Sequence, residues 1–123
     1  MTTRSEIIGL RKVTVRFNIG RRNEFAAIRD ADLSIFSGET VGIVGPSGSG
    51  KSTLLSVASL LRTPTEGEVL IQGQLTATMS RAETTACRAR LFGLVTQRGD
   101  LFPYWTAAEN VMFSAKACGA PIE

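Results

Sequence analysis

Histidine is absent from this sequence of 123 residues. Chemistry that depends on an imidazole from this chain, as a general base or as a metal ligand, is therefore excluded. Cysteine is scarce, because Cys87 and Cys118 are the only two and they lack the spacing of metal ligands. Residues 1–6 are polar and contain no apolar segment typical of a secretion signal. We therefore expect reduced thiols and a cytosolic compartment.

Long apolar runs and a strong charge of one sign are also missing. No run approaches the about 18 apolar residues that a membrane span needs, so we expect any link to a membrane to go through a partner protein. Lys and Arg number 14 against 11 Asp and Glu, a net charge of +3 that predicts no binding to nucleic acid. A hydrophobic content of 43% is typical of a globular protein, and this length allows one domain with a modest core.

What the sequence does contain is organised around residues 40–55. Val41–Val44 is a short apolar run typical of a strand that is buried on both faces. An amphipathic helix is expected to begin at Lys51 and to end near Arg62, ahead of a proline. Its predicted apolar side consists of Leu54, Leu55, Ala58 and Leu61.

Between this strand and this helix lies Gly45-x-x-x-x-Gly50-Lys51-Ser52, the pattern of a phosphate-binding loop. Glycines allow backbone N–H groups to turn inward and approach phosphate oxygens closely, and the N-terminus of the following helix adds partial positive charge. Lys51 can reach the β- and γ-phosphates, and the Ser52 hydroxyl can ligate Mg²⁺. The alternative is a loop that merely turns the chain. The predicted nucleotide-binding residues of the loop are Gly45, Pro46, Ser47, Gly48, Ser49, Gly50, Lys51, Ser52 and Thr53.

The remaining patterns predict strands and helices on both sides of this loop. Alternating apolar residues predict two antiparallel strands before it. Two Ser/Thr-x-x-Glu capping boxes predict the starts of two helices after it. The predicted strands are 10–17, 27–36, 68–72 and a buried core strand at Leu91–Val95, and the predicted helices are 81–90 and 106–118.

In this order the motifs resemble the N-terminal half of an ATP-binding cassette (ABC) transporter ATPase domain. The motif sequences are most similar to those of the type that serves lipoprotein release and macrolide efflux. The resemblance implies an α/β phosphate-loop NTPase core with an N-terminal antiparallel β subdomain, incomplete at its C-terminus. Residues 1–9 would form a tail and residues 10–123 the partial domain. The motifs that carry the resemblance are Ser37–Glu39, Gly45–Thr53, Pro64–Val69, Gln97, Leu101–Pro103 and Thr106–Val111.

The resemblance also implies roles for single residues. Phe17 matches the aromatic residue that stacks on adenine, a contact worth about 1–3 kcal/mol, although it could simply pack in the sheet. Gln97 matches the glutamine that contacts Mg²⁺ or the attacking water, and the alternative is an ordinary polar residue after a strand. Lys51 and Gln97 are thus the implied catalytic residues, and Ser52 and Gln97 the implied metal ligands. Leu101–Trp105 would dock on membrane subunits or pack against a second half of the domain.

ATP and Mg²⁺ are the implied cofactors, and membrane permease subunits and a second ATPase subunit the implied partners. The protein would then lie on the cytoplasmic face of the plasma (inner) membrane. Because the family's Walker B and signature motifs are absent from the sequence, we expect a C-terminal truncation and no hydrolysis by this chain alone. The alternatives are a nucleotide-binding module without activity and a fragment of a non-transport ABC ATPase.

Overall fold

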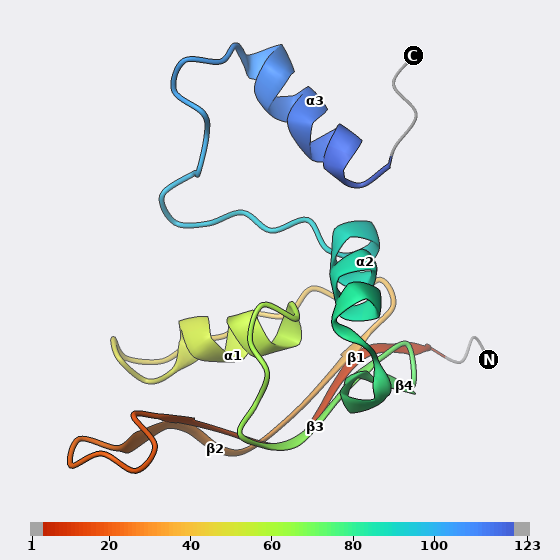
Figure 1. Ribbon diagram of the computed structural model, residues 1–123. Helices are drawn as coiled ribbons and strands as arrows, with labels where there is room; N and C mark the ends of the chain where they lie inside the picture. Colours follow the sequence, from red (N-terminus) through yellow and green to blue (C-terminus); the bar gives the residue numbers. More distant parts are fainter. Residues whose placement is uncertain (1–3, 120–123) are drawn as a thin grey trace. The chain divides into compact units, whose positions relative to one another are not determined.

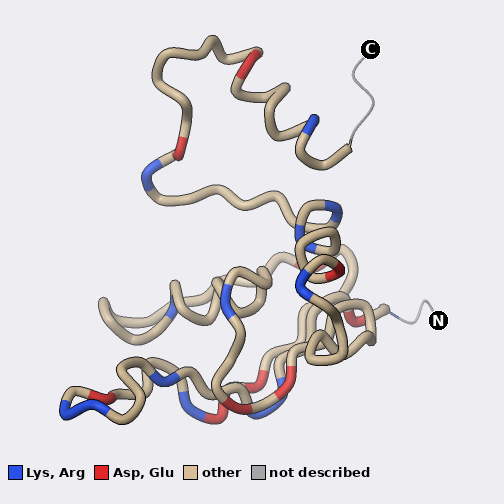
Figure 2. The backbone as a smooth tube through the Cα atoms, in the orientation of Figure 1, with Lys and Arg blue, Asp and Glu red and all other residues tan. Residues whose placement is uncertain are grey.

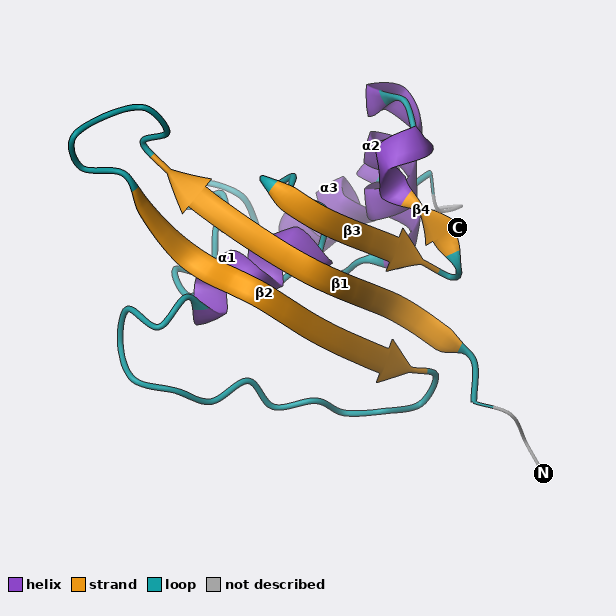
Figure 3. Cartoon of the chain, turned by 90° about the horizontal axis from the view of Figure 1, so that it is seen from below, coloured by secondary structure: helices purple, strands orange, loops and turns teal. Residues whose placement is uncertain are grey.

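The computed structural model describes residues 4–119. The chain divides into two compact units, and the boundary in the sequence lies between Thr84 and Thr85. The first unit holds a four-stranded antiparallel sheet and the eight-residue helix α1 (Figure 1). Its strands lie in the order β2-β1-β3-β4, side by side in Figure 3. Their bounds are β1 Glu6–Phe17, β2 Phe25–Phe36, β3 Glu66–Ile71 and β4 Gln74–Leu75; helix α1 is Lys51–Ala58, and a short 3₁₀ turn, η1, is Thr76–Thr78.

The two long strands confirm the predicted antiparallel pair, but both begin earlier than predicted, β2 at Phe25 instead of Ala27. β1 begins at Glu6, not at Leu10, because residues before Leu10 already pair on both sides: Glu6 with Phe36 of β2, and Ile8 with Ile71 of β3. The part of the predicted tail after Ser5 is therefore strand. At the other end of the hairpin, Phe17 pairs directly with Phe25.

A β-bulge in β1 decides which side chains enter the core. The register shifts between Leu10 and Val13, and Lys12 takes a left-handed φ of 51°. Leu10 and Val13 are both fully buried, although they are three positions apart and a regular strand would place them on opposite faces. The Lys12 backbone N–H donates to the Asp32 carboxylate at 3.0 Å, and this bond is the main cause that holds the pKa of Asp32 below its usual value.

Helix α1 lies against one face of this sheet (Figures 1 and 3). It ends at Ala58, earlier than the predicted Arg62, and turns through Ser59 and Leu60. The predicted apolar side is wrong in part, because Leu55 and Leu61 are about half exposed while Val57 is fully buried. The buried apolar residues of the unit are Leu10, Val13, Val15, Ile28, Val57, Ala58, Leu60, Val69 and Ile71.

The two predicted core strands are not strands in this structure. Residues 40–46 have no regular secondary structure and Val44 is 92% exposed, while Leu91 ends a helix and Val95 is 90% exposed. A strand forms only where a neighbouring strand supplies hydrogen-bond partners, and within residues 4–119 no strand pairs with either run. The prediction of a buried strand at each of these two runs is therefore wrong for the part of the chain that the structure describes.

Both predicted capping boxes are confirmed. Helix α2, Arg81–Leu91, begins after Ser80, whose N–H donates to Glu83 at 2.6 Å while the Glu83 N–H donates back to the serine hydroxyl. Helix α3, Ala107–Ala117, begins with the same reciprocal pair between Thr106 and Glu109. In the described range 4–119, no helix is long and apolar enough to span a membrane.

Charges of both signs are interspersed along the strands, as Figure 2 shows, rather than gathered by sign. Several of them form ion pairs, such as Arg11 with Glu6 within β1 at 2.6 Å and Lys12 of β1 with Asp32 of β2 at 3.0 Å. Charged side chains of opposite sign are therefore partly paired with one another on this sheet.

Candidate functional site

The predicted phosphate-binding loop leads directly into α1, and glycines give it its shape. Gly48 and Gly50 both have left-handed backbones, with φ of 78° and 93°. A Cβ on Gly50 would collide with the carbonyl oxygen of Ala27 in β2, so only glycine permits this close approach of the loop to the sheet. Inside the loop, the Ser49 N–H donates to the Pro46 carbonyl at 3.2 Å.

The start of α1 is left without the usual side-chain partners. Gly50 occupies the N-cap position, no side chain caps the helix, and its first turn contains no acidic residue. The first N–H groups of a helix have no partner inside the helix, and together with the helix dipole they favour an anion. An uncapped start beside a glycine loop therefore fits a phosphate group.

Lys51 turns its side chain back over the loop. Its Nζ donates to the carbonyl oxygens of Gly45 and Pro46, each at 2.7 Å. Three N–H bonds are available on an ammonium group, so at least one donor remains for another acceptor. The predicted lysine is thus held at the loop by the loop's own backbone.

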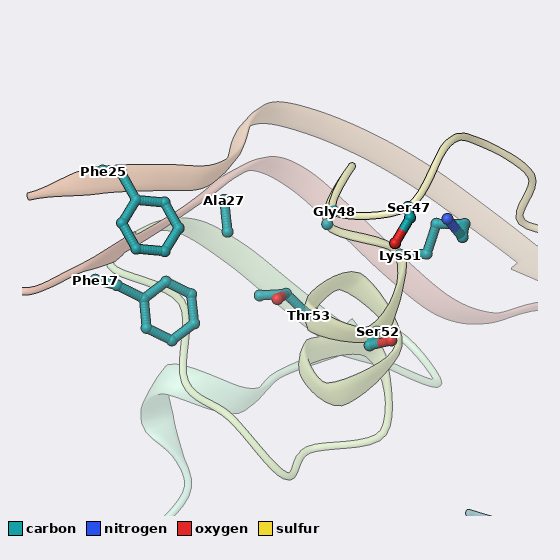
Figure 4. Close-up of a pocket in the computed structure, with 9 residues that line it drawn as sticks. Phe17, Phe25, Ala27, Ser47, Gly48, Lys51, Ser52 and Thr53 are labelled. Carbon is teal, nitrogen blue, oxygen red and sulfur yellow. The ribbon is translucent and has the colours of Figure 1, made fainter. Parts of the chain in front are cut away.

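A pocket of about 570 Å³ connects this loop to the far end of the hairpin (Figure 4). One end is formed by loop and helix residues: Ser47, Gly48, Gly50, Lys51, Ser52 and Thr53. The other end is apolar and is formed by Phe17, Phe25 and Ala27 from β1 and β2. Gly45, Pro46 and Ser49 belong to the loop but do not line this pocket.

The apolar end contains two aromatic rings. Phe17 and Phe25 stack with centroids 5.3 Å apart and planes 15° apart, and Figure 4 shows both at the end away from Lys51. The guanidinium of Arg62 lies over the Phe17 ring, 4.6 Å from its centroid. Phe17 therefore lines the same pocket as the phosphate-binding loop, and its stacking on adenine stays a prediction. Phe25 was not predicted from the sequence, although its position across the hairpin from Phe17 was a usable signal.

Gln97 belongs to the other unit, in a turn that follows α2 rather than at the end of a strand. The turn is closed by the Gly99 N–H, which donates to the Thr96 carbonyl at 3.2 Å, and Gln97 is exposed. Its implied contact with Mg²⁺ or water stays a prediction. Within residues 4–119, no cluster of three or more acidic or cysteine side chains could hold a metal by itself.

The segment after this turn gathers its aromatic residues around one helix. Phe102 stacks on Trp105 with centroids 4.2 Å apart, and both rings meet Phe113 of α3 edge-on. Asn110 fixes the loop, because its side-chain oxygen accepts from the Phe102 N–H at 2.8 Å. Tyr104 is almost fully exposed, at 97%.

Comparison with known proteins agrees with this geometry. The model of the ABC transporter family matches residues 28–121. The lipoprotein-releasing system ATP-binding protein LolD of Cereibacter sphaeroides is 44% identical over 115 residues, which are 94% of this chain and 51% of that protein. The methionine import ATP-binding protein MetN 2 of Enterococcus faecalis is 40% identical over 94% of this chain and 33% of its own. The chain spans about half the length of the LolD proteins it matches, among them that of Roseobacter denitrificans at 50%.

A solved structure supports the fold independently. The ATP-binding cassette MJ0796, in a dimeric post-hydrolysis state bound to ADP and Pi, superposes with a TM-score of 0.85 at 37% identity. The match covers 95% of this chain and 50% of that chain. The antiparallel sheet, the glycine loop and α1 therefore have the arrangement found in such a cassette.

Proposed function

The chain belongs to the ABC transporter family, and from this premise we propose that it binds MgATP through the loop at residues 45–53 to power transport by separate membrane subunits. The expected likeness to lipoprotein-release proteins is confirmed by the LolD relatives. The names of LolD and MetN give different transported substrates, lipoproteins and methionine. Membership of the family therefore assigns no substrate to this chain.

One observation carries the proposal: a single pocket joins an uncapped helix start, a glycine loop and a lysine to an apolar end with aromatic rings. A nucleotide has the same order of parts, an anionic phosphate tail and a flat apolar base. The pocket volume of about 570 Å³ lies within the range of about 300–1,000 Å³ of small-molecule sites. The site therefore suits a nucleoside triphosphate better than an isolated phosphate.

In this proposal the loop binds the nucleotide through backbone N–H groups, one ammonium group and one hydroxyl group. The backbone N–H groups of Gly48, Gly50 and the first turn of α1 would surround phosphate oxygens, and Lys51 Nζ would add a full positive charge. The Ser52 hydroxyl lines the pocket at the helix start and would take one coordination position of Mg²⁺. Mg²⁺ keeps several waters and phosphate oxygens as ligands, and the Ser52 hydroxyl would be one further ligand from this unit. The ion would neutralise charge on the β- and γ-phosphates.

Hydrolysis and assembly are further parts of the same proposal. We propose Gln97, in addition to Lys51, as a catalytic residue, a role in which it would contact Mg²⁺ or the attacking water. A second ATPase subunit is supported by the dimeric MJ0796 cassette. Permease subunits would hold the protein at the cytoplasmic face of the plasma (inner) membrane, with Leu101–Trp105 as the segment that meets them.

Lys51→Ala tests the proposal most directly. A hydrogen bond to a charged group contributes about 1.5–3 kcal/mol, so loss of the ammonium should weaken MgATP binding by about 10- to 150-fold. Lys116→Ala removes an exposed lysine of α3 and is the matched control, which should bind as the parent does. Isothermal titration with MgATP measures both. In cells, the full-length protein with Lys51→Ala should lose nucleotide-dependent transport, and normal transport by this variant would refute the proposal.

A further inference from the structure

We propose that Phe25 is a second base-stacking residue, so that the nucleobase of the bound nucleotide packs against the stacked pair of rings made by Phe17 and Phe25. The inference rests on the proposed function, because it assigns the apolar end of the same pocket. Phe25 is the first residue of β2 and lies well before the phosphate-loop motif at residues 45–53. No sequence motif therefore pointed to it.

The pocket itself carries the first part of the argument. Phe25 lines it together with Phe17 and Ala27, and the same pocket reaches Ser47, Gly48 and Lys51 at its other end. Figure 4 shows the two rings at one end and the loop residues at the other, with Ala27 and Thr53 between them. A ligand held by its phosphates at the loop and extending along this pocket would meet both rings.

The arrangement of the rings carries the second part. Their planes are only 15° apart and their centroids 5.3 Å apart, so the two rings form one stack, and a flat base can extend that stack without reorienting either ring. Phe17 is half-buried and already has the Arg62 guanidinium over its ring. Phe25 is 54% exposed, so it offers more free ring surface than Phe17 does.

The strand register explains why the stacked pair of rings is rigid enough to support a base. Phe17 and Phe25 are directly paired across the hairpin, at the last residue of β1 and the first of β2. Directly opposed side chains on one face of an antiparallel pair lie within contact distance. The loop after Phe17 is tied down as well, since the Gly20 N–H donates to the Glu24 carboxylate at 2.9 Å.

The test compares two ligands that share the phosphate tail but differ in the base: MgATP and magnesium tripolyphosphate. Phe25→Leu keeps an apolar side chain at the hairpin end but removes the ring. Base–aromatic stacking predicts a loss of MgATP affinity of at least about fivefold and no change for tripolyphosphate. Ile19→Ala is the matched control, because Ile19 is an exposed apolar residue of the same hairpin loop that does not line the pocket.

Phe25→Trp provides a second test, in which the measurement is a change in fluorescence and not a loss of MgATP affinity. Its indole keeps a stacking surface, so MgATP should bind at least as tightly as to the parent. MgATP should also quench the added fluorescence while tripolyphosphate leaves it unchanged, with Trp105 of the parent as background. Circular dichroism checks that each variant retains the β-sheet signal of the parent.

The outcomes separate the inference from the function on which it rests. An unchanged MgATP affinity in Phe25→Leu would overturn the role of Phe25 while leaving the phosphate loop intact. Equal losses for both ligands would overturn it too, because they would show that Phe25 supports the loop and not the base. If the parent binds neither ligand, or if Lys51→Ala leaves tripolyphosphate binding unchanged, the proposed function itself fails.

Discussion

Gly50 is the position at which the loop, the helix and the sheet constrain one another most tightly. Its φ of 93° is left-handed, and a Cβ there would collide with the Ala27 carbonyl oxygen. Gly50→Ala therefore adds two separate costs, the backbone strain of an L residue and a steric conflict with the backbone of β2. We expect it to lower the free energy of unfolding and to displace the start of α1.

Two other glycines separate these costs. Gly48 has a left-handed φ of 78° but open space around it, so Gly48→Ala should pay only the backbone strain, about 1–2 kcal/mol. Gly50→Ala adds an overpacking cost of about 1–3 kcal/mol, which brings its total to about 2–5 kcal/mol. Gly42 is not left-handed and has no atom within 4 Å of a built Cβ, so Gly42→Ala should be neutral or stabilise by about 0.4–1 kcal/mol.

Thermal unfolding of the three variants followed by circular dichroism measures this series. In a unit of this size each 1 kcal/mol lowers Tm by about 4–8 °C, so the predicted order is resolvable. Hydrogen exchange at the Leu54 amide, which donates to the Gly50 carbonyl at 2.8 Å, should accelerate most in Gly50→Ala. If Gly50→Ala is no less stable than Gly48→Ala, the close approach of the loop to β2 is wrong.

The two capping boxes give two further predictions. Thr106→Ala removes the N-cap hydroxyl of α3 and should cost about 0.5–2 kcal/mol of helix stability, measured as faster exchange of the Asn110 amide; unchanged exchange would contradict it. The Ser80 side chain, and then its backbone N–H, hold the pKa of Glu83 below its usual 4.5. The stabilising ionised form of Glu83 is therefore fully present above pH 4.5 and lost as pH falls through the lowered pKa. Ser80→Ala should raise that pKa towards 4.5 in a carboxyl NMR titration, and a pKa that stays low would count against the cap.

Local patterns in the sequence predicted local structure well. The alternation in β1 and both capping boxes depend on contacts between residues close in sequence or across one hairpin. The phosphate-loop pattern likewise predicted a glycine loop that leads into a helix beginning at Lys51. The part of the site that rests on backbone geometry could therefore be predicted from residues 45–53 alone.

What sequence reasoning could not predict depends on distant partners. Apolar composition marks Val41–Val44 and Leu91–Val95 as strand-like, but it does not show whether a neighbour will pair with them. The bulge at Lys12 has the same origin, since the periodicity of β1 predicts one face for Val13 and the opposite face for Leu10. Only the pairing with β2 and β3 shows that both are buried.

Ala27 explains how the two ends of the site are held at a fixed spacing. Its side chain lines the pocket, and its carbonyl oxygen is the atom against which Gly50 packs. Phe25 lies on the same strand just before it, paired with Phe17 across the hairpin. Because one strand touches the loop through Ala27 and carries the aromatic end through Phe25, a shift of β2 relative to the loop would move the stacked pair of rings with respect to the phosphate site. The glycine at position 50 therefore matters for the aromatic end of the pocket as much as for the phosphate end.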